Sequence, residues 1–314
     1  MIKTRALKKH FQLARHQTLH AVDGVSLEIS ENEILGLVGE SGSGKSTFGK
    51  TLIGLHERTG GEAFYREEAL PKKFTAADHL RYSKDIQMVF QDPYASLNPR
   101  MTVLDIVGEG LALRGMARAD VQEQVAYWLS RVGLHPDHLS RYPHEFSGGQ
   151  RQRIGIARAM IIEPKFVVCD EPISALDVSV QAQVVNLLED LQRSMGLTLL
   201  FIAHDLSMVR YISDRMAVMY LGTLVETGPS DSVFFSPQHP YTQLLIESNP
   251  EPDPKLERTR NAQILTGEIT SPVNVGPGCR FSDRCPKAMP HCSSETPEPI
   301  KIAEDHIVAC HLYS

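Results

Sequence analysis

The sequence predicts an α/β fold with a largely parallel sheet, and two observations lead to that prediction. Short apolar runs alternate along the chain with stretches of amphipathic helical periodicity, as expected for parallel strands covered by helices. A glycine-rich stretch, GESGSGKST at residues 39–47, stands between one such run and a predicted helix. The apolar runs are EILGLVG (33–39), DIQMVFQ (85–91), FVVCDE (166–171) and TLLFIAHD (198–205).

The composition limits the class of protein to which this chain can belong. Of the 314 residues, 42% are hydrophobic and 22% are charged, as in soluble globular proteins. The formal net charge of −6 argues against a dedicated nucleic-acid binder, which is usually basic. The N-terminal stretch lacks the apolar core of a secretory signal, and no apolar run approaches the about 18 residues needed to span a bilayer. We therefore expect a cytosolic protein that reaches a membrane only through a partner.

Two helices and one hairpin are predicted from periodicity and glycine placement. Apolar residues at helical spacing predict one helix within residues 121–134 and a second that ends at Gly196, a typical C-cap residue. The stretch RMAVMYLGTLVETG predicts a hairpin about Gly222. The expected buried faces are Val121, Val125, Leu129 and Val132 in the first helix, and Val184, Leu188, Leu191 and Met195 in the second.

The stretch at residues 39–47 matches the pattern G-x-x-x-x-G-K-[ST], which predicts a phosphate-binding loop. Several backbone N–H groups must point at one anion, and glycine adopts the required dihedral angles at little cost. The helix that follows adds its positive end. We expect Lys45 to contact the β- and γ-phosphates, Ser46 to bind Mg²⁺ and Thr47 to hydrogen-bond the α-phosphate. The predicted ATP-binding residues of this loop are Gly39, Ser41, Gly42, Gly44, Lys45, Ser46 and Thr47.

Two carboxylates end the apolar run at residues 166–171. Hydrolysis of Mg·ATP needs a metal anchor and a group that orients the attacking water. We expect Asp170 to hold Mg²⁺ through water, and Glu171 to act as the general base or to position the water. The alternative is a pair of surface carboxylates, which the phosphate loop makes less favoured. Cys169 precedes them and is expected to pack in the core.

Polar residues also end two other predicted strands. Because neighbouring parallel strands end at the same edge of a sheet, His204 can contact the γ-phosphate and the attacking water there. Gln91 can bind Mg²⁺ through its side-chain carbonyl oxygen. A lone histidine is more often structural, so the role of His204 depends on the neighbouring phosphate loop.

The stretch FSGGQRQRIGIARAM at residues 146–160 predicts a second anion site. Ser147 can cap a helix whose first amides, at Gly148 and Gly149, are available to an anion. One chain with two anion sites and one nucleotide indicates that the second site serves the ATP of another copy. Three arginines follow, and we expect a solvated helix face rather than a nucleic-acid site from Arg151, Arg153 and Arg158.

The composition changes near residue 248. The stretch NPEPDPKLERTRNAQ is rich in proline and charge, which predicts a linker or strap. We expect an ATPase domain at residues 1–247, with a helical subdomain at about 92–162, and a separate segment at 248–314.

Four of the five cysteines lie in that last segment, with the spacing C-x5-C-x6-C-x17-C: Cys279, Cys285, Cys292 and Cys310. In a reducing compartment, four thiolates suit zinc or an iron–sulfur cluster. The loose spacing and the CP dipeptide favour [4Fe–4S], with zinc and free thiols as alternatives. His291 and His311 could substitute as ligands, but surface histidines are the favoured interpretation. Such a site would staple a small, loop-rich appendage with little core of its own.

Together these motifs make the chain resemble an ATP-binding-cassette (ABC) ATPase, a P-loop NTPase. GESGSGKST resembles the Walker A motif, FVVCDE the Walker B motif with its catalytic glutamate, and FSGGQ the signature, which here begins with Phe instead of the commoner Leu. The stretch SALD at 174–177 resembles the D-loop that ends in Asp177, Gln91 the Q-loop glutamine and His204 the switch histidine. Phe11 occupies the position where the family stacks an aromatic ring on adenine.

The resemblance implies that two cassettes sandwich two ATP molecules, with the Walker A motif of each facing the signature of the other. The residues that would serve the ATP held by the partner are Ser147, Gly148, Gly149, Gln150 and Asp177. Closure of the pair would drive two membrane subunits between inward- and outward-facing states. The stretch DPYASLNPRMTV at 92–103 resembles the surface that grips the membrane subunits.

The tail resembles that of the oligopeptide, dipeptide and nickel importer branch, on the stretches HPYTQLLIESNPEP and GCRFSDRCPKAMPHC. This resemblance implies a motor subunit for import at the cytoplasmic face of the inner membrane, and it favours the [4Fe–4S] cluster further. The implied partners are a second ATPase subunit that is a paralogue, two integral membrane permease subunits and an extracytoplasmic solute-binding protein. The alternatives are a soluble ABC-type ATPase not engaged in transport and a regulatory partner that binds ATP without hydrolysing it.

Overall fold

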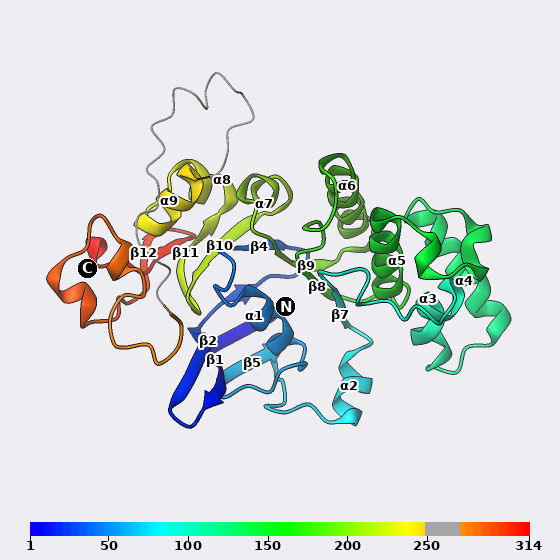
Figure 1. The fold of residues 1–314 in the computed structure, drawn as a ribbon, viewed down its shortest axis with the longest axis horizontal. Coiled ribbons are helices and arrows are strands. Elements are labelled where there is room, and N and C mark those ends of the chain that lie inside the picture. Colours follow the sequence, from blue (N-terminus) through cyan, green and yellow to red (C-terminus); the bar gives the residue numbers. More distant parts are fainter. Residues whose placement is uncertain (249–270) are drawn as a thin grey trace, which may run out of the picture. The chain divides into compact units, whose positions relative to one another are not determined.

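The chain divides into two compact units in the computed structural model, which describes residues 1–248 and 271–314 (Figure 1). The first unit combines Met1–Phe74 with the described part of Ala203–Ser314, and the second unit is Thr75–Ile202. The stretch that predicts a strap, residues 249–263, lies outside the described residues. Where the chain is described, no helix has both the length and the apolar character needed to cross a bilayer.

The first unit contains an antiparallel sheet that the sequence patterns do not predict. Its inner face carries buried apolar side chains such as Ile2, Leu7 and Val22, while the outer face carries exposed charges such as Arg5. The strands lie in the order β2-β1-β5-β6, with β3 beside β1. Their bounds are β1 (Ile2–Ala14), β2 (Gln17–Val25), β3 (Glu28–Ile29), β5 (Gly60–Tyr65) and β6 (Glu68–Ala69).

A second group of strands in the first unit includes the one that leads into the glycine-rich loop. It follows the order β12-β13-β11-β10-β4, and β4 runs parallel to β10. The predicted hairpin is confirmed, because β10 and β11 are antiparallel and Gly222 between them has a φ of 85°. The strands are β4 (Ile34–Val38), β10 (Arg215–Tyr220), β11 (Thr223–Pro229), β12 (Ile300–Ala303) and β13 (His306–Val308).

Short helices complete the first unit. Helix α7 packs closely on β4 because Gly36 has no side chain: a Cβ there would overlap the side chain of Val209. The helices are α1 (Lys45–Leu52), α7 (Leu206–Ile212), α8 (Ser230–Phe235) and α9 (Pro240–Glu247), and the 3₁₀ turns are η3 (Ser282–Arg284), η4 (Pro290–Ser293) and η5 (His311–Tyr313).

The second unit contains three of the predicted strands. They are parallel, in the order β9-β8-β7, and the middle strand β8 is buried along its whole length. Complete burial explains why β8 and β9 are largely apolar. Their bounds are β7 (Ile86–Val89), β8 (Phe166–Asp170) and β9 (Thr198–Ile202).

Helices form the rest of the second unit, and α3, α4 and α5 pack against one another. The predicted face of α4 is confirmed, with Val121, Val125, Leu129 and Val132 buried. In α6, Val184, Leu188 and Leu191 are buried as predicted, Met195 is only half-buried, and the helix ends at Gly196 in the left-handed conformation. The helices are α2 (Ala76–Tyr82), α3 (Val103–Ala112), α4 (Arg118–Arg131), α5 (Gly148–Met160) and α6 (Val178–Met195), and the 3₁₀ turns are η1 (Pro136–Ser140) and η2 (Pro143–Glu145).

Candidate nucleotide-binding site

The glycine-rich loop lies between β4 and α1 in the first unit, as its motif predicts. Three of its glycines have positive φ: 150° at Gly39, 80° at Gly42 and 101° at Gly44. A Cβ at Gly44 would overlap the carbonyl oxygen of Ala21, and one at Gly39 would overlap that of Met219. The loop therefore requires glycine at these two positions both for its dihedral angles and for the close approach of neighbouring backbone.

Lys45 begins helix α1, and its side chain turns back across the loop. The residue is only 3% exposed. Its Nζ donates to the carbonyl oxygens of Gly39 at 2.8 Å and Glu40 at 2.9 Å, and to Oγ of Ser43 at 3.3 Å. These bonds hold the ammonium group beside the loop amides, where a cation can meet phosphate oxygens. Ser46 is half-buried, as is Thr47, and Ser41 and Gly42 are exposed.

Two other predicted residues belong to the first unit. Phe11 lies on β1 opposite Leu19 of β2, half-buried, with its ring 5.4 Å from that of His56. His204 is exposed and directly follows Ala203, whose N–H donates to the carbonyl oxygen of Leu37 on β4. The strand that leads into the phosphate loop thus has His204 near its carboxyl end.

The second unit brings Gln91 and Glu171 together at the carboxyl ends of β7 and β8. The Nε2 of Gln91 donates to Oε2 of Glu171 at 2.7 Å. Glu171 has a φ of 45°, and its N–H donates to the carbonyl oxygen of Ile202. Asp170 is the last residue of β8 and is 1% exposed. Cys169 packs in the core as expected, and burial raises the pKa of its thiol to about 12.

The predicted helix cap at Ser147 is confirmed. The Oγ of Ser147 accepts from the N–H of Gln150 at 3.3 Å, and the Gln150 side chain accepts from the N–H of Ser147 at 3.0 Å. This capping box begins helix α5 at Gly148. Asp177 is the exposed N-cap residue of α6.

The prediction of a solvated arginine face on α5 is wrong. Arg151 is 8% exposed, donates from Nε to the carbonyl oxygen of Pro143 at 2.6 Å, and lies 3.9 Å from the ring of Tyr94. Arg153 donates to the carbonyl oxygen of Val132 at 2.8 Å. Arg158 donates to a carbonyl oxygen as well, that of Ser96 at 2.6 Å. These side chains tie other parts of the second unit to the helix, because guanidinium groups donate to their backbone carbonyl oxygens.

Burial affects the ionisation of three of the four C-terminal cysteines. Burial raises the pKa of Cys279 to about 11, and burial also raises the pKa values of Cys285 and Cys310. Because the thiolate is the metal-binding form, burial by itself works against metal binding by these three residues.

Among the described residues, two groups of three side chains have ligand atoms within 4.8 Å of one another, and neither is the set of four cysteines. One is His291, Cys292 and His311. The other is His10, His20 and Asp23, where Asp23 already receives Arg280 at 2.6 Å and Lys8 at 3.5 Å. Two basic side chains at one carboxylate make the second group unfavourable for a cation.

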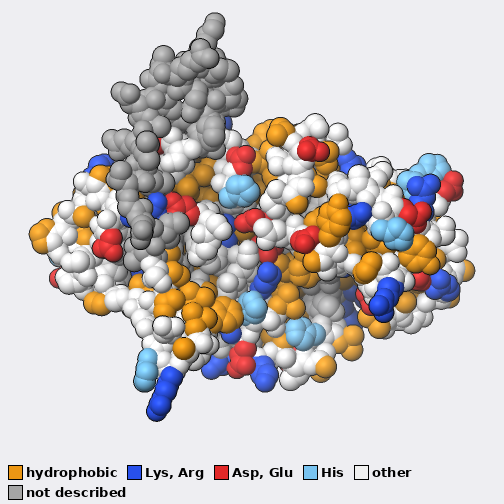
Figure 2. Space-filling model, in the orientation of Figure 1, with side chains coloured by type: hydrophobic (Ala, Val, Ile, Leu, Met, Phe, Trp, Pro, Cys, Tyr) orange, Lys and Arg blue, Asp and Glu red, His pale blue; other side chains and the backbone are white. Residues whose placement is uncertain are grey.

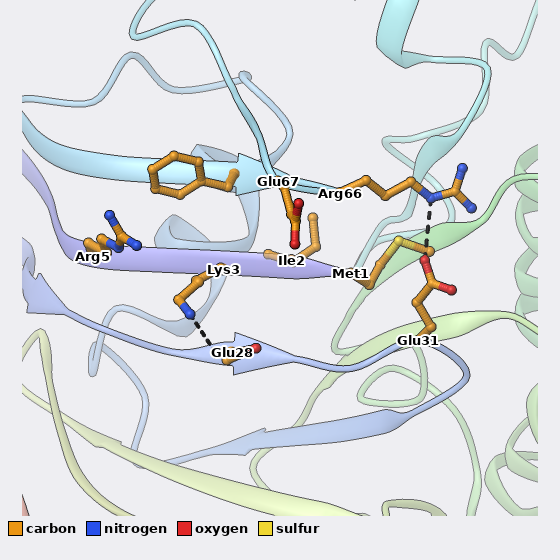
Figure 3. Close-up of a pocket in the computed structure, with 9 residues that line it drawn as sticks. Met1, Ile2, Lys3, Arg5, Glu28, Glu31, Arg66 and Glu67 are labelled. Carbon is orange, nitrogen blue, oxygen red and sulfur yellow. Dashed lines mark ion pairs between the residues drawn. The ribbon is translucent and has the colours of Figure 1, made fainter.

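A cavity of about 620 Å³ lies elsewhere in the first unit (Figure 3). The side chains around it pair with one another: Lys3 with Glu28 at 3.0 Å, and Arg66 with Glu31 at 3.5 Å. None of the predicted nucleotide-binding residues lines it, so it is separate from the candidate site. The lining residues are Met1, Ile2, Lys3, Arg5, Glu28, Glu31, Phe64, Arg66 and Glu67.

Comparison with known proteins identifies related sequences over the whole chain. The family described as ABC transporter matches residues 22–174, and the family described as oligopeptide/dipeptide transporter, C-terminal region, matches residues 225–292. The oligopeptide transport ATP-binding protein OppF of Salmonella typhimurium is 51% identical, over 99% of this chain and 95% of OppF. OppF of Haemophilus influenzae is also 51% identical, over 96% of this chain and 91% of its own length.

Solved structures agree with the sequence matches. The dimeric ATP-binding cassette MJ0796 bound to ADP and Pi is 26% identical and superposes with a TM-score of 0.68, over 73% of this chain and 99% of that chain. The cbiO1 protein from Clostridium perfringens, part of the ABC transporter complex cbiONQ, gives a TM-score of 0.66 at 26% identity, over 75% of this chain and 90% of that chain. The predicted P-loop α/β fold with mixed sheets and helices is therefore that of an ABC cassette.

The [4Fe–4S] prediction is wrong. The relatives that match the full chain are described as transport ATP-binding proteins, and the C-terminal family as a transporter region, with no iron–sulfur centre in either description. The geometry agrees with this correction, because among the described residues the side chains with ligand atoms within 4.8 Å of one another are not the four cysteines, and Cys292 groups with His291 and His311.

The whole-chain identity to OppF, the two family matches and the shared cassette fold lead to one conclusion. The chain belongs to the ABC transporter family, in the branch of the oligopeptide and dipeptide transport ATP-binding proteins.

Proposed function

We propose that the chain is the ATP-hydrolysing motor subunit of an ABC importer for di- or oligopeptides or related small solutes. The observation that carries the proposal is the placement of a carboxylate and an amide at adjoining strand ends, where Gln91 binds Glu171 at 2.7 Å. A phosphate loop with its lysine in place supplies the nucleotide site.

Each half of the reaction has its residues. Lys45 and the loop amides would bind the β- and γ-phosphates, Thr47 the α-phosphate, and Phe11 would stack on adenine. Glu171 would orient and deprotonate the attacking water, and His204 would contact the γ-phosphate. Ser46, Gln91 and Asp170, the last through water, are the side chains that would hold Mg²⁺. The metal neutralises the charge that develops on the phosphate oxygens.

The chain works as a cassette dimer, and its signature serves the nucleotide of the partner cassette. The capping box of Ser147 and Gln150 leaves α5 with its amino end at Gly148 and Gly149, the expected γ-phosphate contact. Asp177 would face the partner across the dimer. We propose a paralogue as the second ATPase, with two integral permease subunits and an extracytoplasmic solute-binding protein.

The domain assignment is part of this proposal. Residues 1–247 would form the cassette, with a helical subdomain at about 92–162 that contains α3, α4 and α5. Residues 248–314 would form a small cysteine-rich appendage. Tyr94, in the stretch at 92–103, has an exposed side chain and would belong to the surface that meets the permeases. The subunit would then lie peripherally at the cytoplasmic face of the inner membrane.

A soluble ABC-type ATPase is less favoured, since the match at residues 225–292 is to a transporter C-terminal region. On the face that Figure 2 shows, Lys and Arg side chains alternate with Asp and Glu, which does not favour a nucleic-acid surface.

The test is co-purification from native membranes in mild detergent, with every co-eluting chain identified. We expect two permease subunits and a second ATPase in stoichiometric amounts, and ATPase activity that requires the assembly. Full ATPase activity of a solitary monomer that is independent of dilution and of any membrane partner would overturn the proposal. A Lys45→Ala chain serves as control, because it should assemble while lacking hydrolysis.

A further inference from the structure

A residue near the C-terminus binds the phosphate loop directly. Arg284 and Glu40, which are 244 positions apart, form a two-pronged ion pair in the first unit: Nη1 to Oε2 at 2.9 Å and Nη2 to Oε1 at 3.0 Å. The side chains are 4% and 19% exposed. Planar pairing of a guanidinium with a carboxylate is the strongest and most directional ion pair that side chains form, and low exposure limits its screening by salt.

An aromatic cluster holds Arg284 in position. Phe281, three residues earlier, is 1% exposed, and its ring lies 5.2 Å from that of Tyr220 and 5.4 Å from that of Tyr241. Arg284 also donates to the hydroxyl of Tyr220 at 3.3 Å. Contacts other than that with Glu40 therefore also position the guanidinium group.

The same loop residue is held at its backbone. The N–H of Glu40 donates to the hydroxyl of Tyr241 at 2.9 Å, and its carbonyl oxygen accepts from Nζ of Lys45 at 2.9 Å. Glu40 thus links residues of α9 and η3 to the ammonium group that would meet the phosphates. A displacement of Glu40 moves one of the groups that set the position of the lysine.

The C-terminal segment, residues 271–314, has a second ionic attachment nearby. Arg280 donates to Oδ2 of Asp23 at 2.6 Å, and Asp23 lies on β2, in the hairpin that carries Phe11. The two arginines are one helical turn apart in sequence and flank the buried ring of Phe281. The segment therefore contacts both the phosphate loop and the hairpin expected to hold adenine.

We propose that Arg284 is a positioning residue for the phosphate loop, acting through Glu40 to hold the loop in its nucleotide-binding conformation. The inference rests on the proposed ATPase function, since it assigns a role in ATP binding to a residue outside all the nucleotide motifs. Loss of the pair would lower affinity for nucleotide, because the loop amides and Lys45 would no longer be preorganised.

The experiment measures ATP affinity of the purified full-length chain by titration with a fluorescent ATP analogue, and thermal stability in parallel. We expect Arg284→Met and Glu40→Gln each to weaken binding about tenfold, and the double variant to be no weaker than either. Arg284→Lys should recover part of the affinity. In the assembled transporter the KM for ATP should rise while kcat is largely kept.

The control is His306→Ala, which removes a buried contact of the same segment with Glu226, 2.8 Å from Nε2 to Oε1, away from the loop. It should lower the melting temperature and leave ATP affinity unchanged. Wild-type affinity in Arg284→Met and in Glu40→Gln would overturn the inference and leave the ATPase proposal standing. A wild-type chain that binds no ATP would overturn both. If Arg284→Met fails to fold, the ATP affinities of Glu40→Gln and Arg284→Lys test the inference instead.

Discussion

The side-chain amide of Gln91 donates a hydrogen bond to the carboxylate of Glu171, with Nε2 and Oε2 2.7 Å apart. The two residues come from the ends of β7 and β8, which are 80 positions apart in sequence and neighbours in the sheet. An amide that donates to the expected general base restricts its rotation and orients its second oxygen. This relationship generates the first two predictions.

Glu171→Gln should bind ATP normally and hydrolyse it about 10²–10⁴ times more slowly, because the amide cannot accept the proton of the attacking water. The ATP-bound form should accumulate as a closed dimer, visible by size-exclusion chromatography. Glu163→Gln is the matched control, since Glu163 also has a positive φ, 55°, but lies in an exposed turn after α5. Near-normal hydrolysis in Glu171→Gln would refute its assigned role.

Gln91→Ala should lower kcat about tenfold, in line with the loss of one hydrogen bond to a charged group. Combined with Glu171→Gln, the change should add less than its full effect, because one role of the amide is to orient the carboxylate and only its contact with Mg²⁺ is independent of Glu171. Steady-state ATPase assays of the single and double variants measure this. Fully additive effects would show that Gln91 works independently of Glu171.

Lys45→Ala should weaken ATP binding at least about tenfold, since the loop loses the ammonium group that its carbonyl oxygens hold in place. Equilibrium titration with nucleotide measures the effect. Lys50→Ala, on the same helix but outside the loop, is the control and should bind ATP like the wild type. Unchanged affinity in Lys45→Ala would count against the phosphate cradle.

Two glycines of the loop should respond differently to alanine. At Gly42 the φ is 80° and a Cβ would meet nothing within 4 Å, so Gly42→Ala should cost only the backbone strain, about 1–2 kcal/mol. At Gly44 the φ is 101° and a Cβ would also overlap the carbonyl oxygen of Ala21, so the loop must move. Gly44→Ala should therefore have the lower melting temperature and no measurable ATP binding. Equal losses in both variants would contradict this explanation.

Acid should destabilise the first unit through His239, because burial lowers its pKa to about 4. The unfolded chain binds a proton near pH 6.5 and the folded chain does not, so stability is lost as pH falls from about 6.5 toward 4. At pH 5 the free energy of unfolding should be lower by about 2 kcal/mol because of His239. His239→Asn keeps a side-chain acceptor for the N–H of Tyr241 at the start of α9 and should reduce the pH dependence. Urea unfolding at pH 7 and pH 5 measures it, with the exposed His16→Asn as control.

Local signals account for what could be predicted from the sequence. A buried strand, a glycine-rich turn and a helix follow one another at residues 34–52, and each is encoded by its own residues. Gly196 and Gly222 mark a helix end and a hairpin in the same way. The cap at Ser147 needs only Gln150, three residues later. Such features depend on neighbours in the chain.

Contacts between distant residues account for what could not be predicted. The spacing of the arginines in α5 predicts a helix but not their contacts. In the structure they donate to the carbonyl oxygens of Pro143, Val132 and Ser96. The N-terminal antiparallel sheet was missed because β1 is rich in charge and its burial is one-sided. The cysteine spacing led to a wrong metal prediction, because spacing does not encode which side chains converge: Cys292 groups with His291 and His311.

The division of the chain has a consequence for folding during synthesis on the ribosome. Residues 75–202 form one contiguous unit, so the contacts within it can form as soon as this stretch emerges. Strand β4, by contrast, waits for β10, about 180 residues later, and Glu40 waits for Arg284. A nascent polypeptide should therefore become able to bind nucleotide only when translation is nearly complete, after its middle portion has become compact.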